Sequence, residues 1–164
     1  MLSVICPIYN EEKYIAKCIE SIVQQDYPKD KLEILFVDGM STDHTREIIE
    51  QYTKEYPYIR IIDNPDKVVP HAMNRGIMAS TGDVIIRLDA HAVYPTNYFS
   101  KLVEGLHQHQ ADNVGAQCRT LPVNQSTTSI AIAEALASSF AAGNAMFRIG
   151  ITEDMATDTV PFGC

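Results

Sequence analysis

The feature that most constrains the fold is a set of short apolar runs without any polar alternation. These runs occupy residues 4–8, 32–37 and 84–86. A strand with one face in water would alternate, so these strands are expected to be buried on both faces, as in a parallel sheet covered by helices. Segments with helical periodicity separate them, at residues 11–25, 43–56 and 70–80, and a further one follows at 95–106. This order predicts an α/β fold, a mostly parallel sheet between two helical layers, with further strands at 58–62 and 113–117.

Composition limits the class of protein. With 164 residues, of which 46% are hydrophobic, the chain is expected to form one domain, residues 1–164, around one core. The net charge of −8 argues against a nucleic-acid partner, which would require a basic face. The four cysteines form no C-x-x-C pair, and no apolar stretch is long enough to span a bilayer. The first strand leaves no room for a signal peptide, so we expect a cytoplasmic location with reduced thiols.

Polar side chains follow three of the expected strands. Pro7 and Tyr9 end the first strand, Asp38 ends the second, and Asp89 and His91 follow the strand at 84–86. The carboxyl ends of parallel strands share one edge of a sheet, where open α/β sheets bind phosphorylated ligands. We therefore expect these residues to converge on one crevice.

Asp89 and His91 form a candidate metal site. The two residues are two positions apart, so in extended backbone their side chains project to the same side. A carboxylate and an imidazole can hold a divalent ion, although an isolated Asp-x-His is more often an ordinary solvated turn.

Four segments in order resemble the family 2 glycosyltransferases of the GT-A fold, which transfer sugars from nucleotide donors. The segments are residues 4–11 (VICPIYNE), 36–43 (FVDGMSTD), 72–77 (AMNRGI) and 87–91 (RLDAH). Residues 88–95 and 158–163 further resemble a subgroup that builds bacterial exopolysaccharides such as succinoglycan, a cell-envelope pathway.

The resemblance implies a set of donor-binding residues and a metal. It places the nucleotide sugar against Pro7, Tyr9, Glu11, Asp38, Asn74, Arg87 and Asp89, with the ion at Asp89 and His91. Two positions depart from the family pattern, because Gly39 stands where many members have an acid that contacts uracil, and His91 replaces the second aspartate of Asp-x-Asp. We expect Gly39 to leave open space and uridine donors to be favoured only modestly over guanosine donors. Mn²⁺ or Mg²⁺ would serve as the ion, and imidazole suits Mn²⁺ better.

The resemblance also implies inverting transfer to a polysaccharide or lipid-linked acceptor by a catalytic base beyond Cys164. Glu153 and Asp154 lie too early in the chain for that role. The chain is then a truncated GT-A domain that is inactive alone, that self-associates through exposed apolar surface, and whose full-length protein sits at the inner face of the membrane. A nucleotide-sugar-binding or scaffold domain without transferase activity is the alternative.

Structural roles compete with binding roles at several of these residues. Asp38 could cap its loop, Arg87 could pair with Asp83 or a neighbour, and Asn10 could cap a first helix in which Glu11 merely favours the dipole. A Rossmann dehydrogenase is excluded, because its glycine-rich turn would follow the first strand and residues 6–13 contain no glycine. A P-loop protein is excluded as well, because no G-K-[ST] motif occurs.

Overall fold

The computed structural model describes residues 1–143, 145–150, 153–157 and 160. The chain forms two compact units, one covering Met1–Gln110 and the other beginning at Ala111. The segment 158–163, which carries part of the exopolysaccharide resemblance, falls almost entirely outside the described residues, as does Cys164.

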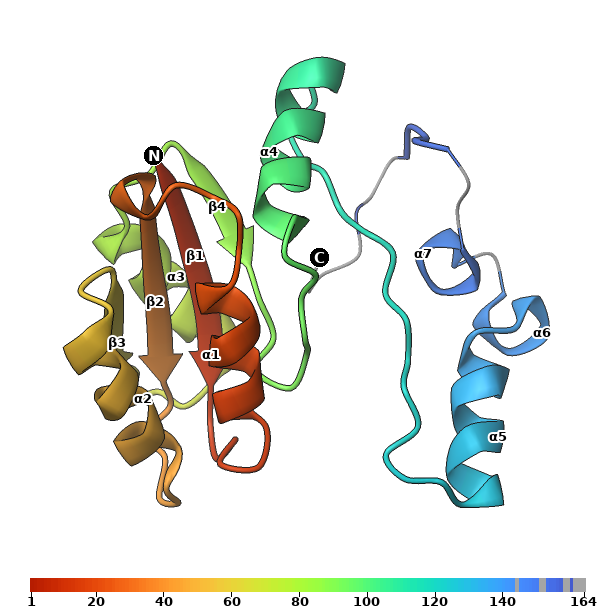
Figure 1. The fold of residues 1–164 in the computed structure, drawn as a ribbon, viewed down its shortest axis with the longest axis horizontal. Helices are drawn as coiled ribbons and strands as arrows, with labels where there is room; N and C mark the ends of the chain where they lie inside the picture. The colour runs from red at the N-terminus through yellow and green to blue at the C-terminus, as the bar shows by residue number, and fades with distance from the viewer. Residues whose placement is uncertain (144, 151–152, 158–159, 161–164) are drawn as a thin grey trace. The chain divides into compact units, whose positions relative to one another are not determined.

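The first unit contains a parallel four-stranded sheet in the order β3-β2-β1-β4. The strands are β1 (Leu2–Ile8), β2 (Leu32–Asp38), β3 (Ile59–Asp63) and β4 (Val84–Arg87). Between and after them lie α1 (Ile15–Val23), a 3₁₀ turn at Lys29–Lys31, α2 (Thr45–Glu55), α3 (Val69–Ala79) and α4 (Tyr98–His109). Helices α1 and α2 pack together over one face and α3 covers the other (Figure 1). The predicted parallel sheet flanked by helices is confirmed.

The two central strands form the core, as their continuous apolar runs predicted. Every residue of β2 is buried, and in β1 only Pro7 is partly exposed. Ile5, Leu35 and Val37 pack with Ala72 of α3. Helix α3 approaches β1 so closely that a Cβ atom at Gly76 would lie 2.5 Å from Ile5 Cγ2. A larger residue at this position would require the Ile5 side chain, the helix or the strand to shift.

A buried carboxylate joins the strands at the opposite end of the sheet from their carboxyl termini. Glu33 of β2 accepts hydrogen bonds from Ser3 Oγ of β1 at 2.6 Å and from Arg60 Nη2 of β3 at 2.8 Å. The backbone and hydroxyl of Thr81, just before β4, also donate to it. Burial alone would raise the pKa of Glu33, but these hydrogen bonds outweigh burial and lower it. Glu33 therefore remains an ionised link across the sheet.

Two local expectations are wrong. Helix α1 begins at Ile15 with Tyr14 at the N-cap position, so Asn10 does not cap it and Glu11 is not in its first turn. Residues 113–117 are described and form no strand.

The second unit contains short helices: α5 (Thr127–Leu136), α6 (Ser139–Ala142) and α7 (Met146–Ile149). Ser126 caps α5 by accepting a hydrogen bond from the backbone N–H of Ser129 at 3.2 Å. Several large apolar side chains are exposed here, including Val123 and Phe140, which is 99% exposed. Across the described part of the chain, none of the helices has the length and apolar character needed to cross a membrane.

Candidate functional site

The parallel register places the ends of the strands along one edge of the sheet. Ile8 of β1 pairs with Asp38 of β2, and Asp38 pairs with Asp63 of β3. On the other side of β1, pairing with β4 stops where Ile5 meets Arg87. The segments that follow these strands therefore emerge at a common edge, as the sequence predicted.

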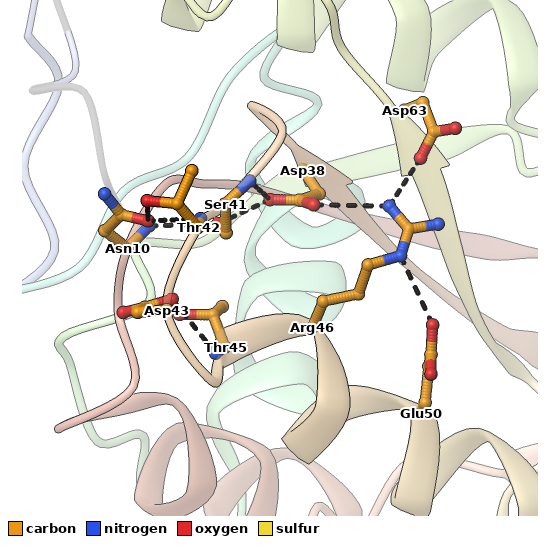
Figure 2. Close-up of polar contacts among 9 residues, drawn as sticks. All are labelled: Asn10, Asp38, Ser41, Thr42, Asp43, Thr45, Arg46, Glu50 and Asp63. Atoms are coloured by element: carbon orange, nitrogen blue, oxygen red, sulfur yellow. Dashed lines mark hydrogen bonds and ion pairs between the residues drawn. The ribbon is translucent and has the colours of Figure 1, made fainter.

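Two loops at this edge are joined by reciprocal hydrogen bonds (Figure 2). They comprise residues 9–12 after β1 and residues 38–45, from the last residue of β2 to the first residue of α2, and we call them the interlocked loops. The backbone N–H of Asn10 donates to Ser41 Oγ at 3.0 Å, and that of Thr42 donates to Asn10 Oδ1 at 2.9 Å. The N–H of Glu11 and of Glu12 continue the pattern, donating to Thr45 Oγ1 at 2.7 Å and to Asp43 Oδ2 at 3.2 Å. Asn10 has a positive φ of 55°, which asparagine tolerates better than most residues, so its role is to hold this loop.

Asp38 lies inside this arrangement, with a side chain that is 1% exposed. Its Oδ1 accepts from the backbone N–H of Ser41 at 3.0 Å and from Ser41 Oγ at 2.6 Å. Its Oδ2 accepts from Arg46 Nη1 at 3.3 Å. Both carboxylate oxygens are thus engaged within the protein, and Asp38 anchors the loop that follows it.

Arg46, in the first turn of α2, extends this network to β3 (Figure 2). Its Nη1 donates to Asp63 Oδ1 at 2.6 Å, and its Nε donates to Glu50 at 3.2 Å. The hydrogen bond to Asp63 is the main reason that the pKa of Arg46 is raised. Sequence reasoning missed Arg46 and Asp63, because the only visible signal was the i,i+4 spacing of Arg46 and Glu50.

Tyr9 occupies the space that was expected at Gly39. A Cβ atom at position 39 would lie 3.2 Å from Cδ2 of the Tyr9 ring, so the expectation of open space is wrong. The Tyr9 side chain remains 45% exposed, and Lys67 Nζ lies 5.9 Å from its ring centroid. An exposed aromatic ring beside a cation forms a surface on which a flat, electron-rich group can stack.

The residues after β4 make two separate contacts. Arg87 Nη2 donates to Asp89 Oδ1 at 3.1 Å, so Arg87 contacts Asp89. His91 Nδ1 lies 3.2 Å from Glu11 Oε1 in the first interlocked loop. The structure therefore brings Glu11 to His91 and Arg87 to Asp89.

The backbone of Asp89 is fixed by two residues that sequence reasoning missed. The hydroxyl of Tyr94 accepts from the N–H of Asp89 at 2.9 Å and donates to its carbonyl at 3.0 Å. Cys18 Sγ donates to the same carbonyl at 3.7 Å. Burial raises the pKa of Tyr94, which keeps the hydroxyl protonated and able to donate.

Pro7 and Asn74 lie apart from these contacts. Pro7 is half-buried in β1, past the last β4 pair, where its missing N–H removes no bond to that strand. Asn74 is exposed on α3.

Residues 90–91 form a turn, so the extended backbone expected at Asp89 and His91 is not observed. A carboxylate and an imidazole have the chemistry to hold a divalent ion when its ligand supplies further oxygens. Among the described residues, no group of three or more His, Cys, Asp or Glu side chains could hold a metal ion. Ions such as Mg²⁺ are commonly held by one or two carboxylates together with substrate phosphates, so a two-residue donor set is sufficient when a diphosphate supplies further oxygens.

The fold and this edge define an α/β domain of the GT-A class. The sequence profile described as Glycosyl transferase family 2 matches residues 3–157, and the chain belongs to this family. It is 34% identical over 149 residues to the succinoglycan biosynthesis protein ExoA of Rhizobium meliloti (strain 1021), covering 90% of this chain and 44% of that protein. It is 44% identical over 102 residues to a Methanococcus voltae diacetamido-dideoxy-glucuronosyltransferase acting on dolichyl N-acetyl-glucosaminyl phosphate, covering 61% and 32% of the two chains. The chain thus spans less than half the length of these relatives.

Solved structures share the fold. The mannosyltransferase PcManGT of Pyrobaculum calidifontis, in complex with GDP-Man and Mn²⁺, matches with a TM-score of 0.64 and 29% identity over 83% of this chain and 40% of that chain. TarS of S. aureus, in complex with UDP-GlcNAc, matches with a TM-score of 0.67 and 23% identity over 76% and 36% of the two chains.

Proposed function

We propose that this chain is the donor-binding part of a glycosyltransferase that uses a nucleotide-diphosphate sugar. The observation that carries the proposal is the shared sheet edge, where an exposed aromatic ring, an Arg–Asp pair and an imidazole follow neighbouring parallel strands. Membership of glycosyl transferase family 2 supports it. Uridine donors are favoured over guanosine donors by a modest margin.

Each part of the donor has a proposed partner. Pro7 and Tyr9 flank the base and ribose, with Asp38 anchoring the loop behind them. Arg87 and Asp89 face the diphosphate, because a guanidinium is well suited to phosphate oxygens. Glu11 and Asn74 complete the donor site.

Asp89 and His91 would hold Mn²⁺ or Mg²⁺ together with the diphosphate. The ion would neutralise the charge that develops on the leaving diphosphate. The Pyrobaculum relative, which was solved with Mn²⁺ and GDP-Man, supports this assignment.

Transfer itself would proceed with inversion to a glycan or lipid-linked acceptor in polysaccharide synthesis. We place the general base in sequence beyond Cys164, and the whole protein in the cytoplasm at the inner face of the membrane.

The second candidate function is nucleotide-sugar binding without transfer, as in a scaffold domain. It is favoured by the short span of the chain relative to its relatives.

Titration calorimetry of UDP tests the metal-dependent donor site. We expect UDP to bind more tightly with Mn²⁺ than with a chelator. Asp89→Ala should abolish this metal dependence, and His91→Ala should weaken it on the order of tenfold, as is common for lost contacts around a metal. The exposed residues Asp30 and His107 provide matched controls as Asp30→Ala and His107→Ala. Equal affinity with Mn²⁺ and with chelator would contradict the proposal.

A further inference from the structure

The buried position of Asp38 leaves the reading of the nucleobase to other residues. Its side chain is 1% exposed and both of its oxygens accept hydrogen bonds from Ser41 and Arg46. A base at the strand-end edge can therefore reach Asp38 only by displacing these partners.

The next polar groups along the same edge are accessible. Asp63 is paired in register with Asp38 and its side chain is 58% exposed, while that of Arg46 is 38% exposed. Arg46 Nη1 and Asp63 Oδ1 are 2.6 Å apart, so the two side chains form a hydrogen-bonded ion pair. Along the edge of the sheet, Tyr9 follows the end of β1 and Asp38 ends β2. Asp63 ends β3, so the pair comes next in this row.

The residue after Asp63 has a buried polar side chain that bonds towards the start of α3, where its amide nitrogen donates to the carbonyl of Val68 at 3.2 Å. Asn64 follows Asp63, is 1% exposed and donates its backbone N–H to the carbonyl of Asp38 at 2.7 Å. Among the described residues its Oδ1 is a buried acceptor with no hydrogen-bond partner. Such groups are rare in folded proteins and require an explanation, such as a ligand or ordered water that completes them.

We propose that the Arg46–Asp63 pair is the specificity-determining element that reads the nucleobase of the donor. This rests on the proposed function, because it assumes that a nucleoside diphosphate binds at this edge. Asp63 Oδ1 is engaged by Arg46, so Oδ2 is the acceptor, and the remaining guanidinium N–H groups are donors beside it. With Oδ2 opposite the ring nitrogen and the guanidinium opposite the exocyclic group, this pair complements the ring N–H and the C=O that uracil and guanine present. Cytosine and adenine carry an unprotonated ring nitrogen at that N–H position and are disfavoured.

Asp63→Asn is the decisive variant, because it reverses one hydrogen bond and leaves the pair in place. The amide oxygen can still accept from Arg46, while the NH₂ group replaces Oδ2 and becomes a donor. Calorimetry in the presence of Mn²⁺ would measure the affinities for UDP, GDP, CDP and ADP. We expect the wild-type chain to prefer UDP and GDP, and Asp63→Asn to weaken UDP and strengthen CDP, changing their affinity ratio on the order of tenfold.

Arg46 supplies the second test. Arg46→Met should also bring the UDP to CDP ratio towards one, and Arg46→Lys should restore part of it because lysine keeps a cationic donor. Arg60→Met is the matched control, since Arg60 pairs with a carboxylate of the same sheet at its other end, through Arg60 Nη2 and Glu33 Oε2 at 2.8 Å, and should leave the ratio unchanged.

The outcomes separate this inference from the proposed function. If the wild-type chain binds none of the four nucleotides, the proposed function fails and this inference fails with it. If the wild type binds UDP and CDP equally, or if Asp63→Asn and Arg46→Met weaken all four nucleotides by the same factor, only the base-reading role is overturned.

Discussion

At the scale of single residues, the position of Asp89 depends on a hydroxyl group elsewhere in the chain. Tyr94 exchanges two hydrogen bonds with the backbone of Asp89, at 2.9 and 3.0 Å, and its side chain is buried. This doubly bonded hydroxyl fixes the turn from which both Asp89 and His91 project.

Tyr94→Phe should weaken both the fold and metal-dependent nucleotide binding. The substitution keeps the ring but leaves a partly buried N–H and carbonyl without this partner, which costs about 1–3 kcal/mol of unfolding free energy. Urea denaturation and UDP titration with Mn²⁺ would measure the two effects. Tyr58→Phe, which alters a tyrosine that packs against Tyr56, is the control. Unchanged Mn²⁺ dependence in Tyr94→Phe would show that the hydroxyl does not position Asp89.

The sequence allowed the strand-end residues to be predicted but not their partners. Asp38 ends an apolar strand, and Asp89 and His91 come shortly after another, so their place at one edge followed from the parallel topology. Arg46 and Tyr94 act on residues eight and five positions away through side-chain directions that no periodicity encodes. The alternative that Asp38 caps its own loop matches the structure, because Ser41 folds back onto the carboxylate.

At the scale of secondary-structure elements, the strands could be predicted because continuous apolar runs indicate strands that are buried on both faces. The start of α1 was not, because Asn10 and the two glutamates have the composition of a helix start. Their backbone N–H groups instead meet side chains of the second interlocked loop, and this tertiary contact overrides the local capping preference.

Glu33 gives the sheet a pH-dependent link between its strands. Because hydrogen bonds lower its pKa in the folded state, Glu33 stabilises the fold above the ordinary glutamate pKa of about 4.3. This contribution is lost as pH falls from there through the lowered pKa. Glu33→Gln should therefore reduce the unfolding free energy at pH 7 by about 1–3 kcal/mol and by less at pH 3.

Urea denaturation of both proteins at the two pH values would measure this difference. Glu104→Gln, which removes an exposed carboxylate paired with Lys101, should have little effect at either pH. An equal loss for Glu33→Gln at pH 7 and pH 3 would contradict the role of its ionised form.

At the scale of the whole molecule, the proposed donor residues all belong to the first unit. Pro7 through His91 fall within Met1–Gln110, whereas the exposed apolar side chains Val123 and Phe140 belong to the second unit. We propose that exposed apolar side chains such as these promote self-association of the chain.

We expect the chain to bind donor but to transfer sugar slowly compared with the longer relatives that it matches. Loss of general-base assistance typically lowers a rate about 10²- to 10⁴-fold, and loss of acceptor positioning lowers it further. Parallel assays of sugar transfer and donor hydrolysis would measure this and would also distinguish an enzyme from a scaffold domain. Transfer by the 164 residues at the rate of such a relative would contradict the expectation and make Glu153 or Asp154 the leading candidate for the base.

The interlocked loops also set a rule for building chimaeras between relatives. The N–H groups of Asn10, Glu11 and Glu12 all depend on side chains that the second loop supplies. A graft that replaced residues 9–12 or residues 38–45 alone would leave donors and acceptors of the retained loop unmatched. We therefore expect a chimaera to acquire the donor preference of a relative only when both loops are transferred together.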